Sequence, residues 1–248
     1  MSRLRLARRT AAILGLLLAY LPLHYGWKLA GRRSRWPRRF LGGVGRSAGL
    51  RPRVVGTPLP SHVLFAANHL SWLDIMIVAD ATGAAFVSKD EVARWPVIGW
   101  LAGLNDTIFI ARADRRSVRG QADTLRAALA TGRPVALFPE GTTGGGEQVL
   151  PFRASLFAAL LPPLPRLKVQ PIAIDYGAAA GEIAWTGDEG AGANAKRVLS
   201  RKGTARVTLH FLDPLDPSEW PDRKALAEAA RIRIIEALGA SAGGANLL

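Results

Sequence analysis

The sequence predicts an α/β fold with a mostly parallel or mixed central sheet flanked by helices, preceded by an N-terminal membrane-associated helix. Apolar runs of strand length alternate with longer helical patterns, as in a sheet covered by helices. The 248 residues suffice for one sizeable domain beside a basic, apolar N-terminal segment. Polar residues follow several strand-like runs, where such sheets collect functional groups. We therefore expect an N-terminal anchor at residues 1–45, a main domain at 46–240 and a flexible tail at 241–248.

Charge is concentrated at the N-terminus. Residues 1–53 hold 13 of the 33 Lys and Arg of the chain and none of its 19 Asp and Glu. These cations flank an apolar run, Ala11–Leu23, which fits attachment to an anionic membrane surface. A nucleic-acid binder more often carries its basic residues on a face of the folded domain, so nucleic acid is not an expected partner.

The apolar run is short for a membrane span. Ala11–Leu23 has 13 residues, whereas a span needs about 20. Positive charge on both sides also disfavours crossing, because orientation follows an asymmetry of Lys and Arg. We expect a monotopic helix, interfacial or re-entrant, or a single N-terminal membrane helix, with the protein on the cytoplasmic face of the inner membrane. A signal peptide is the alternative, although no small-residue cleavage site follows cleanly. The absence of Cys fits a reducing compartment and excludes thiol catalysis.

The main domain is read as strands and helices in alternation. The expected strands are Val63–Ala67, Ala84–Ser88, Thr107–Ala111, Pro134–Phe138, Val169–Asp175 and Ala205–Leu212. The expected helices are Leu73–Ala81, Val97–Leu104, Arg115–Ala130, Ser155–Leu161 and Arg223–Leu238. The Gly- and Ala-rich stretch Gly187–Ala195 is expected to form a flexible surface loop.

An imidazole and a carboxylate, His69 and Asp74, lie five positions apart directly after the first expected strand. On one continuous helix, five residues turn the side chain by about 140°, so the pair would not meet. We therefore predict that His69 lies in a turn and Asp74 in the first turn of the following helix. Asp74 has a second interpretation, because Ser71 and Asp74 fit a capping box. The two roles are compatible, since one carboxylate oxygen could accept a backbone N–H while the other accepts Nδ1–H of His69.

Arg112 directly follows the expected strand Thr107–Ala111. A guanidinium there suits a bidentate phosphate contact, whereas the simpler interpretation is an exposed charge or a partner for Asp106 or Asp114.

A second polar cluster, Phe138-Pro139-Glu140-Gly141-Thr142, closes another strand and leads into Gly144-Gly145-Gly146. Backbone N–H groups of such a loop can approach an anion or oxyanion, and a plain glycine loop is the alternative. Arg153 comes just before an expected helix, where it could complement a bound phosphate or be an ordinary solvated cation.

The chain resembles the 1-acylglycerol-3-phosphate acyltransferase family of membrane glycerolipid acyltransferases. Four blocks match in order, with Phe86-Val87-Ser88-Lys89-Asp90-Glu91-Val92 as a further likeness, and they cover about residues 60–175. They are Asn68-His69-Leu70-Ser71-Trp72-Leu73-Asp74, Thr107-Ile108-Phe109-Ile110-Ala111-Arg112, Phe138-Pro139-Glu140-Gly141-Thr142 and Val169-Gln170-Pro171-Ile172-Ala173-Ile174. Many members have a basic residue followed closely by Gly after the acidic block, whereas this chain has Arg153-Ala154-Ser155.

The resemblance implies that residues 46–240 form the catalytic domain. By it, His69 is the base, Asp74 orients it, and Arg112, Glu140 and Gly141 form the acceptor-phosphate site; we add Thr142 and Arg153 as substrate-binding residues. The expected reaction transfers an acyl group from acyl-CoA or acyl carrier protein to the free hydroxyl of 1-acyl-glycerol-3-phosphate, with no cofactor and no metal. The alternatives are another lysolipid acceptor such as lyso-ornithine lipid, a hydrolase, and a non-catalytic membrane-binding protein.

Overall fold

A computed structural model of the chain describes residues 2–110, 117–187 and 189–245. Seven strands form one sheet in the order β1-β7-β6-β2-β5-β3-β4. Neighbouring strands pair in parallel except β6 and β7, which are antiparallel, so the sheet is mixed as the sequence predicts. The strands are β1 (Leu50–Val55), β2 (Val63–Ala67), β3 (Ala85–Lys89), β4 (Ile108–Ile110), β5 (Val135–Leu137), β6 (Lys168–Asp175) and β7 (Ala205–Phe211).

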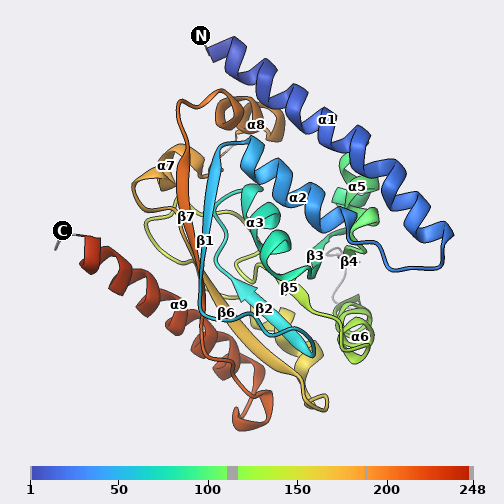
Figure 1. Cartoon of the computed structure of the whole chain (residues 1–248). Coiled ribbons are helices and arrows are strands. Elements are labelled where there is room, and N and C mark those ends of the chain that lie inside the picture. Colours follow the sequence, from blue (N-terminus) through green and yellow to red (C-terminus); the bar gives the residue numbers. More distant parts are fainter. Residues whose placement is uncertain (1, 111–116, 188, 246–248) are drawn as a thin grey trace.

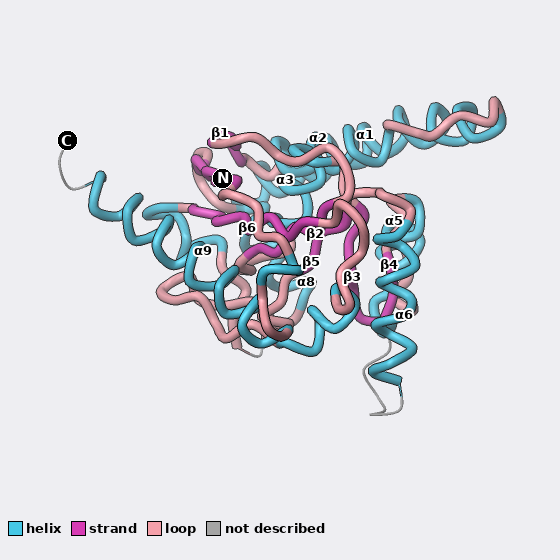
Figure 2. Tube along the Cα trace, turned by 90° about the horizontal axis from the view of Figure 1, so that it is seen from below, coloured by secondary structure: helices cyan, strands magenta, loops and turns pink. Residues whose placement is uncertain are grey.

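Helices lie on both faces of the sheet (Figures 1 and 2). The α-helices are α1 (Ser2–Leu29), α2 (Trp36–Ser47), α3 (Leu73–Thr82), α4 (Asp90–Ala93), α5 (Ile98–Leu104), α6 (Ser117–Ala130), α7 (Ala180–Ile183), α8 (Ala191–Ser200) and α9 (Arg223–Ala245). Short 3₁₀ helices are η1 (Ala154–Leu160), η2 (Gly177–Ala179) and η3 (Pro217–Glu219). Figure 1 shows α9 on the opposite side of the molecule from α1 and α2.

Strand β2 joins the two layers of the core. All five of its side chains are buried, and they point alternately to the two faces of the sheet. Val63, Phe65 and Ala67 belong to the cluster packed around α3. Leu64 and Ala66 belong to the cluster formed with α6, η1 and α9. The continuous apolar run that predicts this strand is therefore a consequence of burial on both faces.

The register of the central strands brings three strand ends together. Ala66 of β2 lies opposite Leu137 of β5, and Ala67 lies opposite Ile172 of β6. Because the three strands are parallel, the segments that follow β2, β5 and β6 emerge at the same edge of the sheet. His69, Glu140 and Tyr176 come from these three segments.

Helix α1 is longer than the apolar run that predicts it, because the basic flanks continue the helix. Within the described part of the chain, α1 is the one helix long and apolar enough to cross a membrane by length and composition. It packs beside α2 and against α8. Arg9 is buried there, and its guanidinium donates to the carbonyl oxygens of Val198, Leu199 and Gly203 at 3.3, 3.2 and 2.7 Å.

Several expected boundaries were wrong. The stretch Gly187–Ala195 is not a loop throughout, because α8 begins at Ala191. Polar side chains organise its start, since Glu189 accepts hydrogen bonds from Asn194 and Arg197. Helix α9 continues to Ala245, beyond the expected end at Leu238, and the flexible tail at 241–248 stays a prediction. The expected helix Ser155–Leu161 is the 3₁₀ helix η1.

Strand β1 and helix α2 are among the elements that sequence analysis missed, as are the short helices α4, α7, η2 and η3. Pro52 interrupts the pattern of β1, which lies at an edge of the sheet with five of its six residues exposed. Helix α2 contains three glycines, which disfavour a helix in isolation. Close packing explains two of them, because a Cβ at Gly42 would lie 2.2 Å from Oδ1 of Asp80 in α3, and one at Gly43 would lie 2.7 Å from Leu16 in α1.

Candidate active site

His69 and Asp74 meet as the sequence predicts. The ring nitrogen Nδ1 of His69 lies 2.8 Å from Oδ2 of Asp74. His69 sits in the turn after β2, and Asp74 lies in the first turn of α3, which begins at Leu73. The imidazole keeps 16% of its surface exposed while the carboxylate is fully buried. A partly exposed base next to a buried carboxylate is the arrangement needed to activate an outside hydroxyl group.

The Asp74 carboxylate also closes the turn that holds His69. Oδ2 accepts the backbone N–H groups of Leu70 at 2.7 Å and Ser71 at 2.8 Å, in addition to the imidazole. The expected capping box is formed in part: Asp74 accepts the backbone N–H of Ser71, and the Ser71 hydroxyl oxygen accepts the backbone N–H of Leu73 at 3.4 Å, although the assigned helix has Trp72 rather than Ser71 as its N-cap residue. Asp74 thus combines the structural and the orienting role on a single oxygen atom. The other oxygen, Oδ1, is left for a different partner.

That partner is Tyr176, which sequence analysis did not identify. Its hydroxyl group donates to Oδ1 of Asp74 at 2.6 Å, and the whole side chain is buried. Burial and the adjacent Asp74 raise the pKa of Tyr176 well above its usual value, so the phenol keeps its proton and acts as a donor. Tyr176 directly follows β6, and 102 residues separate it from Asp74. The sequence signal that could have identified Tyr176 as a site residue is its position directly after an apolar strand.

Two further contacts fix the His69 turn in place. The amide of Asn68 exchanges two hydrogen bonds with the backbone of Ile174 in β6, at 3.0 and 2.7 Å. The ring of Phe138, at the end of β5, stacks on the imidazole with the centroids 3.9 Å apart and the planes 11° from parallel. The base is therefore held by both neighbouring strands as well as by α3.

Glu140 lies beneath the same turn and is 4% exposed. Oε1 accepts the backbone N–H of His69 at 2.8 Å, and Oε2 accepts the N–H of Leu150 at 3.2 Å. Burial raises the pKa of Glu140 to about 7, although these two backbone hydrogen bonds oppose the shift. The structure gives this carboxylate a positioning contact to the base, and its expected contact with the acceptor stays a prediction.

The glycine-rich loop lies against the base. The N–H of Gly144 donates to the carbonyl oxygen of His69 at 2.7 Å, and the N–H of Gly141 donates to that of Phe138 at 3.0 Å. Gly141 has a φ of 72°, a conformation that glycine adopts without strain. Thr142 is exposed beside them, as a substrate-binding residue requires. The loop is thus anchored at two amides and open at its tip.

Arg153 reaches the same region from the start of η1. Its side chain is exposed, and its Nε lies 3.3 Å from the carbonyl oxygen of Glu140. Arg112 lies outside the described residues, because the structure does not describe 111–116. Its expected contact with a phosphate therefore stays a prediction, as do those of Gly141, Thr142 and Arg153.

The arrangement can carry out proton transfer at a hydroxyl group. A carboxylate only accepts hydrogen bonds, so the bond from His69 to Asp74 places the imidazole proton on Nδ1. No hydrogen bond to Nε2 occurs within the described residues, and its lone pair is the basic position. A serine or cysteine nucleophile is not needed, since an incoming alcohol can itself be deprotonated there.

Comparison with known proteins identifies relatives of the chain. The family described as Acyltransferase matches residues 51–175. A lyso-ornithine lipid O-acyltransferase from Rhodobacter capsulatus is 38% identical, over 95% of this chain and 90% of that protein. A second, from Brucella abortus, is 34% identical over 90% of each. A 1-acyl-sn-glycerol-3-phosphate acyltransferase from Neisseria gonorrhoeae is 33% identical, over 70% of this chain and 69% of that protein.

A solved structure has the same architecture. The crystal structure of the 1-acyl-sn-glycerophosphate (LPA) acyltransferase PlsC from Thermotoga maritima matches with a TM-score of 0.64. The match covers 97% of both chains at 20% sequence identity. At that identity the likeness supports the fold alone.

Proposed function

The chain belongs to the acyltransferase family, and on that premise we propose that it transfers a fatty acyl group from a thioester donor to the free hydroxyl group of a membrane lysolipid. The observation that carries the proposal is the hydrogen bond of 2.8 Å between His69 and the buried Asp74. It leaves the second imidazole nitrogen available to a substrate. His69 acts as the general base, and Asp74 and Tyr176 position it.

In the proposed reaction, Nε2 of His69 accepts the hydroxyl proton as the alcohol oxygen attacks the carbonyl carbon of the thioester. Asp74 stabilises the imidazolium that forms. The tetrahedral intermediate collapses by breaking the carbon–sulfur bond, and the imidazolium returns its proton to the departing thiolate. Acyl-CoA and acyl carrier protein are the two candidate donors. The step requires neither a cofactor nor a metal.

The negative charge on the intermediate needs hydrogen-bond donors. The glycine-rich loop supplies them in our proposal, because it lies against the backbone of His69. The N–H groups of Gly141 and Gly144 already donate to Phe138 and His69. We therefore assign the oxyanion to other amides at the tip of the loop, next to the exposed Thr142.

Two acceptors are supported, and we rank lyso-ornithine lipid first. Two relatives with that name match over 95% and 90% of this chain at 38% and 34% identity. Lysophosphatidic acid ranks second, since the relative of that kind from Neisseria gonorrhoeae matches over 70% of the chain. The two acceptors differ in charge, because ornithine carries an amine and a carboxylate whereas lysophosphatidic acid carries a phosphomonoester.

Helix α1 supports attachment to the membrane. Its outward side exposes large apolar residues at helical spacing, with Leu14, Leu18 and Leu29 exposed by 53%, 74% and 89%. The hydrogen bonds from Arg5 and Arg9 to the end of α8 hold this helix along the domain. We propose that α1 lies flat in the membrane interface, on the cytoplasmic face, with the exposed basic residues near its ends, such as Arg3 and Arg8, facing anionic headgroups.

The test is transfer by the purified protein with a radiolabelled acyl thioester and a panel of lysolipids. We expect lyso-ornithine lipid to give the fastest acylation and lysophosphatidic acid a slower one. His69→Ala should lower kcat by at least about a thousandfold, because a general base and its proton relay are lost together. Acyl-CoA and acyl carrier protein donors are run in parallel arms.

Product analysis separates transfer from hydrolysis. Release of free fatty acid at the same rate with and without a lysolipid would replace the proposal by a hydrolase. Retention of more than a few per cent of turnover in His69→Ala, with an unchanged circular dichroism spectrum, would remove the base assignment. Faster acylation of lysophosphatidic acid would reverse the ranking of acceptors without changing the chemistry.

A further inference from the structure

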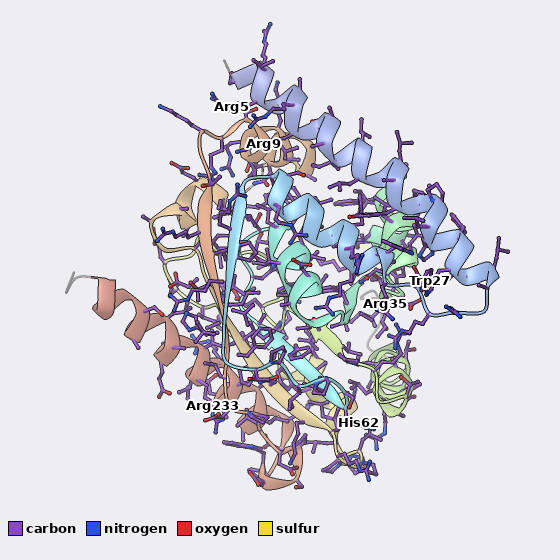
Figure 3. The ribbon with its side chains drawn as sticks, in the orientation of Figure 1. Arg5, Arg9, Trp27, Arg35, His62 and Arg233 are labelled. Carbon is purple, nitrogen blue, oxygen red and sulfur yellow. The ribbon has the colours of Figure 1, made fainter. Side chains whose placement is uncertain are left out.

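An open cavity of about 740 Å³ lies where the turn after α1 leads into α2. Figure 3 labels Trp27 and Arg35 at this end of α1, and Arg5 and Arg9 at the other end. The first residues of α2 line the cavity together with the segments that precede β2, β3, β4 and β5. Five arginines contribute to the lining, namely Arg33, Arg35, Arg38, Arg39 and Arg133.

The cavity has an excess of positive charge. Two acids, Asp80 and Asp106, line it with the five arginines, and both are already paired. Arg46 contacts Asp80 at 2.6 Å, and Arg133 contacts Asp106 at 2.7 Å. Arg38 donates to the backbone oxygens at the end of α3. Within the described residues, the exposed side chains of Arg33 and Arg35 make no hydrogen bond or ion pair, so they are available to a ligand.

The start of α2 adds to the attraction for an anion. Arg35 is the N-cap residue of α2 and makes no side-chain capping bond, while the Ser34 hydroxyl accepts the N–H of Trp36 at 3.3 Å; Ser34, Arg35 and Pro37 at this helix end all line the cavity. The partial positive charge of a 12-residue helix therefore faces the same cavity as the guanidinium groups. Helix and side chains together form a concave cationic surface, which suits the geometry of a phosphate group.

A smaller, aromatic cavity of about 240 Å³ adjoins the cationic one. Trp27, Arg35, Trp36 and Arg39 line it, so the two arginines are shared by both cavities. Arg39 stacks over the ring of Trp36 at 5.1 Å, and Tyr20 stacks on the same ring. Tryptophan and tyrosine with cations beside them are typical of the headgroup level of a membrane. The aromatic cavity beside the arginines favours a phosphate group that belongs to a lipid over a free phosphate ion.

The cationic cavity is separate from the candidate active site. The segments that line it come before the parallel strands, whereas His69 and Glu140 come after β2 and β5. The five residues of β2 alone span about 16 Å between these two edges. A ligand in the cavity is therefore not the acceptor at the base.

We propose that this cavity binds the headgroup phosphate of an anionic phospholipid that is not a substrate, with Arg33 and Arg35 as its main contacts and Trp27 and Trp36 against the glycerol region. The proposal rests on the proposed attachment of α1 to the membrane. The bound lipid fixes the far end of α1 at the headgroup level, while the basic N-terminal end lies beside α8.

The test is flotation of the purified full-length protein with vesicles of phosphatidylcholine, with and without phosphatidylglycerol. The variant Arg33→Gln/Arg35→Gln should lose about 50-fold in affinity for the anionic vesicles, because two charge-assisted hydrogen bonds are removed. Its affinity for pure phosphatidylcholine should stay within about twofold, since α1 and its apolar side are unchanged.

The matched control is Arg3→Gln/Arg8→Gln, which removes the same charge from exposed positions at the other end of α1. We expect it to lose about fivefold or less, because charges outside a concave site are screened by salt. An equal loss in both variants would mean diffuse surface attraction and would overturn the site. An unchanged affinity of Arg33→Gln/Arg35→Gln for the anionic vesicles would overturn it as well.

Kinetics in neutral detergent micelles separate a lipid from a soluble phosphate ligand. Arg33→Gln/Arg35→Gln should keep kcat and the KM for acyl-CoA within about twofold of wild type. A raised KM for acyl-CoA with unchanged vesicle binding would reassign the cavity to the donor and overturn the proposal. Because flotation needs no turnover, a protein that binds through these arginines without transferring acyl groups would contradict only the proposed function.

Discussion

At the scale of single residues, the Asp74 carboxylate has four hydrogen-bond partners, and Tyr176 is the one on Oδ1. Removing its hydroxyl group leaves that oxygen buried without a donor. We expect Tyr176→Phe to lower kcat about tenfold and to leave the acceptor KM within about twofold, because a bond to a charged group contributes about 1.5–3 kcal/mol. Steady-state kinetics in mixed micelles provide the measurement.

A purely structural role for Tyr176 predicts a different pattern. It would lower the melting temperature while leaving kcat per folded molecule unchanged. Tyr20→Phe is the matched control, since it removes a hydroxyl group from a ring that stacks on Trp36 rather than from the site. If Tyr176→Phe shows an unchanged kcat per folded molecule and the pH–rate profile of wild type, the positioning role is excluded.

Glu140 gives a second prediction at this scale, on the pH dependence of stability. Its pKa is raised from 4.5 to about 7 by burial in the folded protein. Between these values the folded protein binds more protons than the unfolded chain, so stability falls as pH rises through this window. The free energy of unfolding of wild type relative to Glu140→Gln should therefore decrease by at most about 3 kcal/mol from pH 4.5 to pH 7.

Urea unfolding of both proteins across this range measures the difference. Glu147→Gln is the matched control, because it removes an exposed carboxyl group from the same loop. A difference for Glu140→Gln that stays flat, or grows with pH, would contradict a buried carboxyl group with a raised pKa.

Which site residues sequence analysis can find depends on their distance along the chain. His69 and Asp74 are five positions apart, so the turn-then-helix geometry follows from local periodicity. Tyr176 contacts Asp74 across 102 residues, and Glu140 contacts His69 across 71. Those contacts depend on the relative register of β2, β5 and β6, which no local pattern specifies.

At the scale of elements, the attachment of α1 to α8 depends on one buried cation. Arg9 bonds the carbonyl oxygens of Val198 and Leu199 in the last turn of α8 and of Gly203 beyond it, and it is 6% exposed. We expect Arg9→Ala to destabilise the protein by about 2–3 kcal/mol, or roughly 5–10 °C in Tm. Arg8→Ala, an exposed neighbour, should change Tm by less than about 2 °C. Equal shifts in differential scanning calorimetry would contradict the capping role.

The elements that sequence analysis missed share a physical cause. Helix α2 depends on packing against α3 rather than on its own helix propensity, as Gly42 beside Asp80 illustrates. Strand β1 depends on pairing with β7, from Leu50 opposite Ala205 to Val55 opposite His210. Helix α8 depends on the hydrogen bonds that Asn194 and Arg197 donate to the carboxylate of Glu189. In each case tertiary contacts override local composition.

At the scale of the whole molecule, the mixed sheet and its helical layers were predictable because β2 and its neighbours carry long apolar runs. The sequence also predicted that polar groups after separate strands would meet, and His69 and Glu140 do so. The pairing of β6 and β7 as antiparallel neighbours was not predictable, since strand composition does not report direction. The sequence pattern likewise gave no sign of the arginine-lined cavity, which gathers residues from five separate segments.

The parallel stacking of Phe138 on His69 has a consequence for stereochemistry. The phenyl ring covers one face of the imidazole, and the Nε2 lone pair lies in the ring plane, so an incoming alcohol meets Nε2 at the ring edge with one flank already closed. A chiral secondary alcohol presents different substituents to the closed and the open flank, so its two hands are not equivalent at this base. The enzyme should therefore discriminate between mirror-image acceptors even where headgroup recognition is permissive.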